Sequence, residues 1–224
     1  MRVALLLCLF LSACTARPLT PYEKAFAQSL FGGTTATDRI RFFDGALVGK
    51  VTYTRQKRPR LACRERIWPE PTTQTVTVGP AAVTILNKVF FAKPYFTENY
   101  LLGAPQSFNL FAAMLVAHEL THVWQWQHRD KTGYSPFKAM QEHDFKGDPY
   151  LYDINTKTGF LDYAYEQQAA IVEEYVCCKV LDPDAPRTHR LHALLKEAFP
   201  VQELTLPSSV RLPWKGAQTK GICH

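Results

Sequence analysis

The segment His118-Glu119-Leu120-Thr121-His122 has the residue types and the spacing of the H-E-x-x-H pattern. On a helix, residues four apart lie one above the other on the same face, so both imidazoles could reach one Zn2+ ion. Glu119 would lie beside the open side of that ion, where it could take a proton from a water molecule. The flanking residues are apolar, which predicts a buried helix. The alternative to a metal site is a chance match to this pattern on a helix of the hydrophobic core.

A catalytic zinc ion usually has three protein ligands, so one more ligand must come from another segment. The helical stretch expected over residues 161–180 offers Glu166, Glu173 and Glu174. The run H-E-L-T-H-V-W-Q, followed about forty residues later by E-Q-Q-A-A-I-V-E-E-Y, resembles the gluzincin family of zinc metallopeptidases. It is also similar to bacterial H-E-L-T-H-V-W-Q proteins that are linked to Vgr-type or toxin-like modules.

This resemblance implies that the third zinc ligand is Glu166, the glutamate that opens E-x-x-A. Glu173 lies two turns later on nearly the same face. It could hydrogen-bond to a side chain that binds zinc and fix its orientation, or it could itself be the zinc ligand. Many gluzincins carry an aspartate a few residues after the ligand, which fixes the orientation of a zinc histidine. Here that position is Ala170. The hydrogen bond that orients the histidine must therefore come from Glu173, Glu174 or a backbone carbonyl.

Other side chains are weaker candidates. Tyrosines flank the helix expected over 161–180, and one phenol could stabilise an oxyanion. Tyr163, one turn before Glu166, is the first choice for that role. Four further histidines have no partner at ligand spacing within an expected helix, and these are His128, His143, His189 and His192.

The N-terminus has the features of an export signal. Arg2 precedes an apolar run from Val3 to Leu11, which is too short to span a bilayer. The run L-S-A-C that ends at Cys14 resembles the lipobox of bacterial lipoproteins, which implies a signal peptide at 1–13 and an acylated Cys14 held in a lipid bilayer. Thr15 rather than aspartate follows, which favours the periplasmic face of the outer membrane. The alternative is an ordinary signal peptide with a chance cysteine.

Export places the remaining cysteines in a compartment that permits disulfides. Cys177 and Cys178 are adjacent on an expected helix, where neighbouring side chains diverge, so they should not bond to each other. We therefore expect at least one of them to bond to Cys63 or Cys223. A zinc site made of these cysteines would lack any C-x-x-C spacing.

The 224 residues suit one α+β domain, expected at 32–224 after a tether and short helix at 14–31. Residues rich in β-branched side chains predict strands at 46–54 and 74–78. Asn87-Lys88 predicts a tight turn that makes 82–91 a hairpin, and the resemblance to zinc peptidases implies that this hairpin lies beside the cleft. Helical periodicity marks 108–128, 161–180 and 189–199. We expect a small, twisted, largely antiparallel sheet packed on the zinc-binding helix and on the second ligand-bearing helix.

The formal net charge is +6, and the basic residues are scattered along the sequence. The basic run at 55–66 predicts a solvated loop first, and a weak contact with anionic lipid or cell-wall polymer second. No nucleic-acid motif accompanies it.

Together these features predict an exported, membrane-anchored zinc metallopeptidase that hydrolyses peptide bonds in envelope proteins or cell-wall peptides. One alternative is a zinc-stabilised structural or assembly lipoprotein without turnover. Another is a module that binds envelope polymers through residues 55–66.

Overall fold

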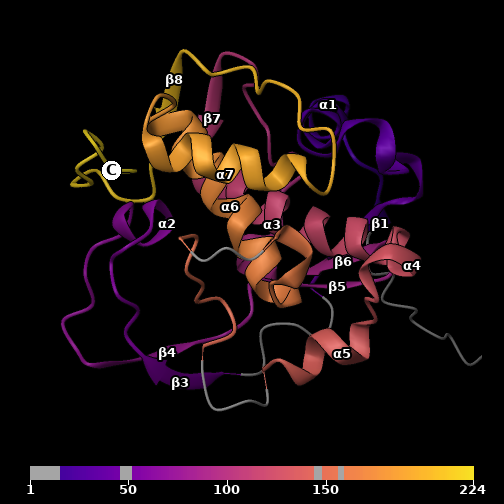
Figure 1. Ribbon diagram of the computed structural model, residues 1–224, viewed down its shortest axis with the longest axis horizontal. Helices are drawn as coiled ribbons and strands as arrows, with labels where there is room; N and C mark the ends of the chain where they lie inside the picture. Colours follow the sequence, from indigo (N-terminus) through magenta and orange to yellow (C-terminus); the bar gives the residue numbers. More distant parts are fainter. Residues whose placement is uncertain (1–15, 46–51, 144–147, 156–158) are drawn as a thin grey trace, which may run out of the picture.

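The computed structural model describes residues 16–45, 52–143, 148–155 and 159–224. Cys14 and the expected signal peptide lie outside these residues. The fold is α+β, as predicted: helices pack beside small sheets, and two long helices lie side by side at its centre (Figure 1). These are α3 (Leu110–Gln127) and α6 (Tyr165–Leu181), and α7 (Pro186–Lys196) packs against α6.

Helix α3 is buried over most of its length, which explains its apolar sequence on all faces. It begins after Asn109, whose side chain accepts a hydrogen bond from the backbone amide of Ala112. Helix α6 begins four residues later than expected, because residues 160–162 form a separate 3-10 turn. Both central helices are therefore confirmed, with shifted ends.

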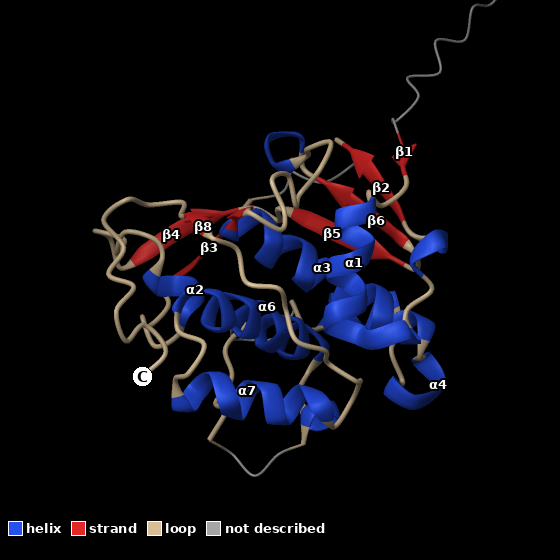
Figure 2. Cartoon of the chain, turned by 90° about the horizontal axis from the view of Figure 1, so that it is seen from above, coloured by secondary structure: helices blue, strands red, loops and turns tan. Residues whose placement is uncertain are grey.

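The main sheet has four strands in the order β1-β2-β6-β5, so β5 lies at an edge, beside α3 (Figure 2). The predicted hairpin is confirmed, and it turns at Leu86, whose φ is 60°. Two of the three strand pairs in this sheet are antiparallel, in keeping with the largely antiparallel sheet expected, and β2 pairs with β6 in parallel. The strands are β1 (Ala16–Arg17), β2 (Arg41–Asp44), β5 (Ala82–Ile85) and β6 (Lys88–Phe91).

Two further strand pairs and several short helices complete the described chain. The antiparallel pair is β3 (Tyr53–Gln56) with β4 (Thr75–Val78), and the parallel pair is β7 (Ser107–Asn109) with β8 (Ser209–Arg211). The short helices are α1 (Pro21–Phe31), α2 (Cys63–Arg66), α4 (Arg129–Thr132) and α5 (Pro136–Gln141). The 3-10 turns are Gly32–Thr34, Thr37–Arg39, Lys93–Tyr95 and Phe160–Asp162.

The N-terminal part is not a tether where the structure describes it. Strand β1 adds to the main sheet, and α1 buries Phe26 and Leu30 in the core. The guanidinium of Arg17 makes an ion pair of 2.8 Å with the buried carboxylate of Glu23. Residues 16–31 therefore belong to the folded domain.

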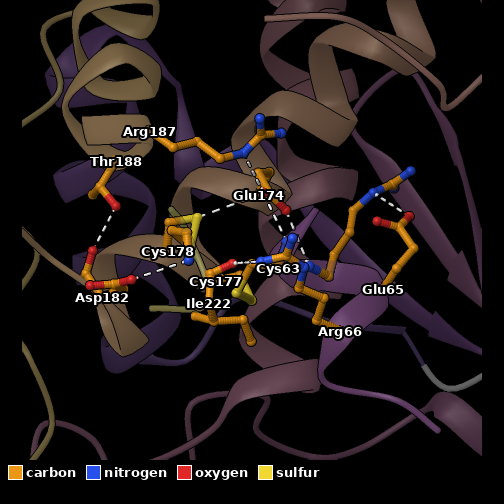
Figure 3. Close-up of a disulfide and its surroundings, with 12 residues drawn as sticks. Cys63, Glu65, Arg66, Glu174, Cys177, Cys178, Asp182, Arg187, Thr188 and Ile222 are labelled. Carbon is orange, nitrogen blue, oxygen red and sulfur yellow. Dashed lines mark hydrogen bonds and ion pairs between the residues drawn. A yellow bond between two sulfur atoms is a disulfide. The ribbon is translucent and has the colours of Figure 1, made fainter. Parts of the chain in front are cut away.

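Two disulfides hold α2 and the C-terminal segment against α6: Cys63 bonds to Cys177 (Figure 3), and Cys178 bonds to Cys223. Each adjacent cysteine thus reaches one of the distant ones, in keeping with the divergence of neighbouring side chains on a helix. In the described ranges no helix is long and apolar enough to cross a membrane.

The basic segment 55–66 is not the solvated loop that the sequence predicts. The Arg64 side chain is buried and pairs with Glu173, and Arg58 pairs with Asp148. Arg60 and Arg66 are partly exposed and donate hydrogen bonds to backbone carbonyls. These arginines act largely as internal braces of the fold.

Candidate metal centre

Helices α3 and α6 bring His118, His122 and Glu166 together. One ligand atom from each lies within 4.8 Å of the others, and all three residues are buried. Oε2 of Glu166 is 3.1 Å from Nε2 of His118 and 3.4 Å from Nε2 of His122. Two ligands about 2.1 Å from a tetrahedral zinc ion lie about 3.4 Å apart. The donor set and its spacing therefore fit zinc.

The outer nitrogen of each histidine has its own partner. Nδ1 of His122 lies 2.9 Å from Oε1 of Gln125, whose amide nitrogen donates to Gln168. Oε1 therefore faces the imidazole and accepts its Nδ1–H, which leaves Nε2 of His122 with a lone pair toward the centre. Nδ1 of His118 lies 3.4 Å from a carboxylate oxygen of Glu173. Glu173 thus braces a ligand, while Glu174 points elsewhere and accepts from the backbone amides of Cys63 and Arg64.

Glu142, the residue that follows α5, positions Glu166. The carboxylate of Glu142, which follows α5, accepts hydrogen bonds of 2.9 Å from the backbone amides of Tyr165 and Glu166. A carboxylate at this place satisfies two of the unpaired amides at the start of α6. The first turn of α6 is thereby fixed where Glu166 meets the two histidines.

Opposed charges control protonation at this centre. Burial would lower the pKa of His118, but the hydrogen bonds and charges of Glu166 and Glu173 raise it to about 10. Burial would raise the pKa of Glu173, but the charge of Arg64 and the contact with His118 lower it to about 2. Because a zinc ligand must be deprotonated, metal binding here releases protons.

Glu119 lies beside the ligands and is also buried. Its Oε2 accepts a hydrogen bond of 2.7 Å from the hydroxyl of Thr84 on strand β5. Burial raises the pKa of Glu119, although the nearby His118 and His122 oppose that effect. A fixed carboxylate whose pKa is raised is a better proton acceptor than an exposed one, so Glu119 is equipped to act as a base.

A cleft of about 490 Å³ opens at this centre, between β5 and α5. Tyr134, Tyr150 and His143 line it, and Nε2 of His143 lies 3.0 Å from Oε1 of Glu166. Tyr163 does not line it, since its hydroxyl donates to the carbonyl of Asp153 at 2.9 Å. The tyrosines at the site therefore come from the loops around α5, which sequence spacing did not single out.

Cys63, Cys178 and Cys223 also lie close enough together to suggest a metal group. All three are bonded in disulfides, so they offer no thiolate ligand. His128, His189 and His192 are not among the groups that could hold a metal ion in the described chain.

No protein-family model and no curated protein sequence matches the chain. Among solved structures, it is similar to the effector domain of Pseudomonas aeruginosa VgrG2b. The two share 19% sequence identity and a TM-score of 0.51, over 83% of this chain and 85% of the other. This likeness shows a shared fold.

Proposed function

We propose that this protein is an exported zinc metallopeptidase that hydrolyses peptide bonds in envelope proteins or in the peptide part of the cell wall. The observation that carries the proposal is the group of His118, His122 and Glu166 with the base Glu119 held beside it. A structural zinc site usually has four protein ligands and needs no base. Three protein ligands with a buried carboxylate alongside are the arrangement of a hydrolytic site.

The chemistry that zinc supplies in such a site is Lewis acidity, which polarises a carbonyl and lowers the pKa of a water molecule. Glu119 takes a proton from the attacking water and delivers it to the leaving amine nitrogen. The C–O bond forms as Glu119 takes the proton from the water, and the C–N bond then breaks as Glu119 passes that proton to the amine nitrogen, which returns Glu119 to its starting state. Thr84 fixes the direction of the carboxylate through both transfers.

The edge strand β5 supports a peptide as the substrate. It borders the cleft, and within the described residues no strand pairs with its outer side. An extended peptide could add to this edge by backbone hydrogen bonds, which requires no particular side chain.

The substitution Glu119→Gln tests the proposed reaction. The amide is nearly isosteric but cannot accept the proton, so zinc content should stay while turnover falls roughly 100- to 10,000-fold. A peptide-library digest at equal zinc content is the measurement. Equal cleavage by both proteins would refute the role of Glu119. Full zinc with no cleavage by either protein, across peptides and cell-wall fragments, would favour a structural lipoprotein.

The proposal includes an envelope location, with the mature chain held in a membrane by acylated Cys14. Two features support export: the lipobox-like run before Cys14 and a fold shared with a domain described as an effector. The full chain should fractionate with membranes, and Cys14→Ser should leave an unprocessed or mislocalised precursor. Wild-type protein found wholly in the soluble periplasm would contradict the anchor.

A further inference from the structure

The cleft continues past the candidate metal centre into a second hollow of about 300 Å³. The two hollows share Pro80, Ala82, His118, Glu119 and Tyr150. The first, here called the apolar lobe, is lined by Val83, Ile85, Phe137 and Met140. The second, here called the basic lobe, is lined by Arg55, Arg58, Arg64 and Trp68.

The apolar lobe holds large apolar side chains that face solvent. Phe137 is 63% exposed, Met140 57% and Ile85 46%, and they come from α5 and from β5. These side chains gather around one hollow next to the reacting groups, which is how a subsite for an apolar side chain is built.

In the basic lobe, two of the three arginines have close ion pairs, of 3.1 Å or shorter. Arg58 makes two hydrogen bonds to Asp148 and lies over the Tyr150 ring at 4.7 Å, and Arg64 pairs with Glu173. Arg55 is paired less closely: its Nη1 donates to the carbonyl of Gln56, and its Nε lies 3.9 Å from Oδ2 of Asp148, the carboxylate that Arg58 already binds. Among the described residues, Arg55 and Arg58 thus share the one carboxylate of Asp148, and a partly exposed guanidinium whose charge is only partly compensated suits an incoming carboxylate.

The direction of β5 determines which end of a bound peptide would lie in each lobe. The strand runs from Ala82, shared by both lobes, to Ile85 in the apolar lobe. Its two-residue hairpin pairs Ile85 with Lys88 and Val83 with Phe90, which leaves the backbone groups of alternate residues facing the free edge. A peptide that pairs antiparallel there has its amino side in the apolar lobe and its carboxyl side in the basic lobe.

We propose that the substrate is a peptide with an apolar side chain before the scissile bond and a carboxylate after it, bound by Arg55. This proposal rests on the proposed peptidase function. The carboxylate can be an acidic side chain or the C-terminus of a short peptide, and the same guanidinium would bind either one.

Matched peptides test this substrate class on the zinc-loaded full chain. One series carries leucine before the bond and Glu, Gln or Lys after it. A second series has a free or an amidated C-terminus directly after the bond. The wild type should prefer a carboxylate over its neutral match in at least one series, by roughly 10- to 100-fold in kcat/KM. Arg55→Gln should abolish that preference, whereas Arg39→Gln, which removes an exposed charge outside the cleft lining, should keep it.

The same preference should appear in the Kd of uncleaved peptide for the zinc-loaded Glu119→Gln variant. Cleavage without any preference for a carboxylate, or a preference for leucine after the bond and the acid before it, would overturn this inference and leave the peptidase standing. Absence of both zinc and cleavage would instead contradict the proposed function itself.

Discussion

Gln125 is a hydrogen-bond partner of His122 that the sequence analysis did not predict. It closes the run H-E-L-T-H-V-W-Q and lies three residues after His122, so the two side chains meet on one face of α3. We expected outside support from Glu173, Glu174 or a backbone carbonyl. In the structure, Glu173 contacts His118, as expected. His122 instead bonds to the side-chain amide of Gln125, because Gln125 lies one turn further along the same helix.

Replacing Gln125 with Ala should weaken zinc binding by roughly 10- to 100-fold, because Nδ1 of His122 loses the acceptor that fixes its tautomer. The measurement is a competition titration with a zinc-binding dye. Gln127→Ala is the matched control, since Gln127 lies on the same helix but bonds away from the site, to Ala36 and Asn87. An unchanged affinity in Gln125→Ala would show that Gln125 does not orient His122.

Thr84, His143 and Tyr150 could not have been found from the sequence. They come from an edge strand and from the loops around α5, and their places at the site depend on contacts between segments far apart in the chain. Only the i, i+4 geometry of the two histidines is local, so only those ligands and Glu119 follow from spacing alone.

At the scale of elements, α2 connects a disulfide to the candidate metal centre. The Cys63–Cys177 bond and the carboxylate of Glu174 hold α2 against α6, and Figure 3 shows Glu174 near Cys63 and Arg187. Arg64, the next residue of α2, reaches Glu173, which in turn contacts His118. The position of His118 in the candidate metal centre therefore depends on where α2 is held.

We expect the two disulfides to differ in their effect on zinc. Losing either one should cost on the order of 4 kcal/mol of unfolding free energy, since both close long loops. Only Cys63→Ser with Cys177→Ser should also weaken zinc binding, because it frees the helix that carries Arg64. Zinc affinity and thermal midpoint, measured on both double variants, check this.

The Cys178→Ser, Cys223→Ser variant is the control, because that bond joins the C-terminal segment to α6 and reaches α2 only indirectly, through the Arg66 hydrogen bond to the carbonyl of Ile222. Equal zinc affinity in both double variants, at a temperature where both are folded, would contradict the link through Arg64.

The sequence predicted the elements with strong local patterns and missed those that need distant partners. Alternating β-branched residues around a tight turn predicted β5 and β6, and apolar runs with caps predicted α3 and α6. Strand β1 has two residues, and its pairing with β2 depends on tertiary contacts such as the Arg17–Glu23 pair. The parallel register of β2 and β6 likewise has no local signal.

At the scale of the molecule, the α+β class followed from the order of helical and strand patterns, and a solved effector domain shares the fold at low sequence identity. The candidate metal centre lies where the sheet edge, α3, α5 and α6 meet, so no single segment contains it. One domain thus supplies the ligands from its two central helices and the walls of the cleft from its smaller elements.

Zinc content of the purified soluble domain is the most direct test of this account. We expect one equivalent of zinc in wild-type protein after dialysis, and almost none after His122→Ala, because two ligands remain of three. Circular dichroism should show that the variant is folded. A full equivalent of zinc retained by folded His122→Ala would contradict the site formed by His118, His122 and Glu166.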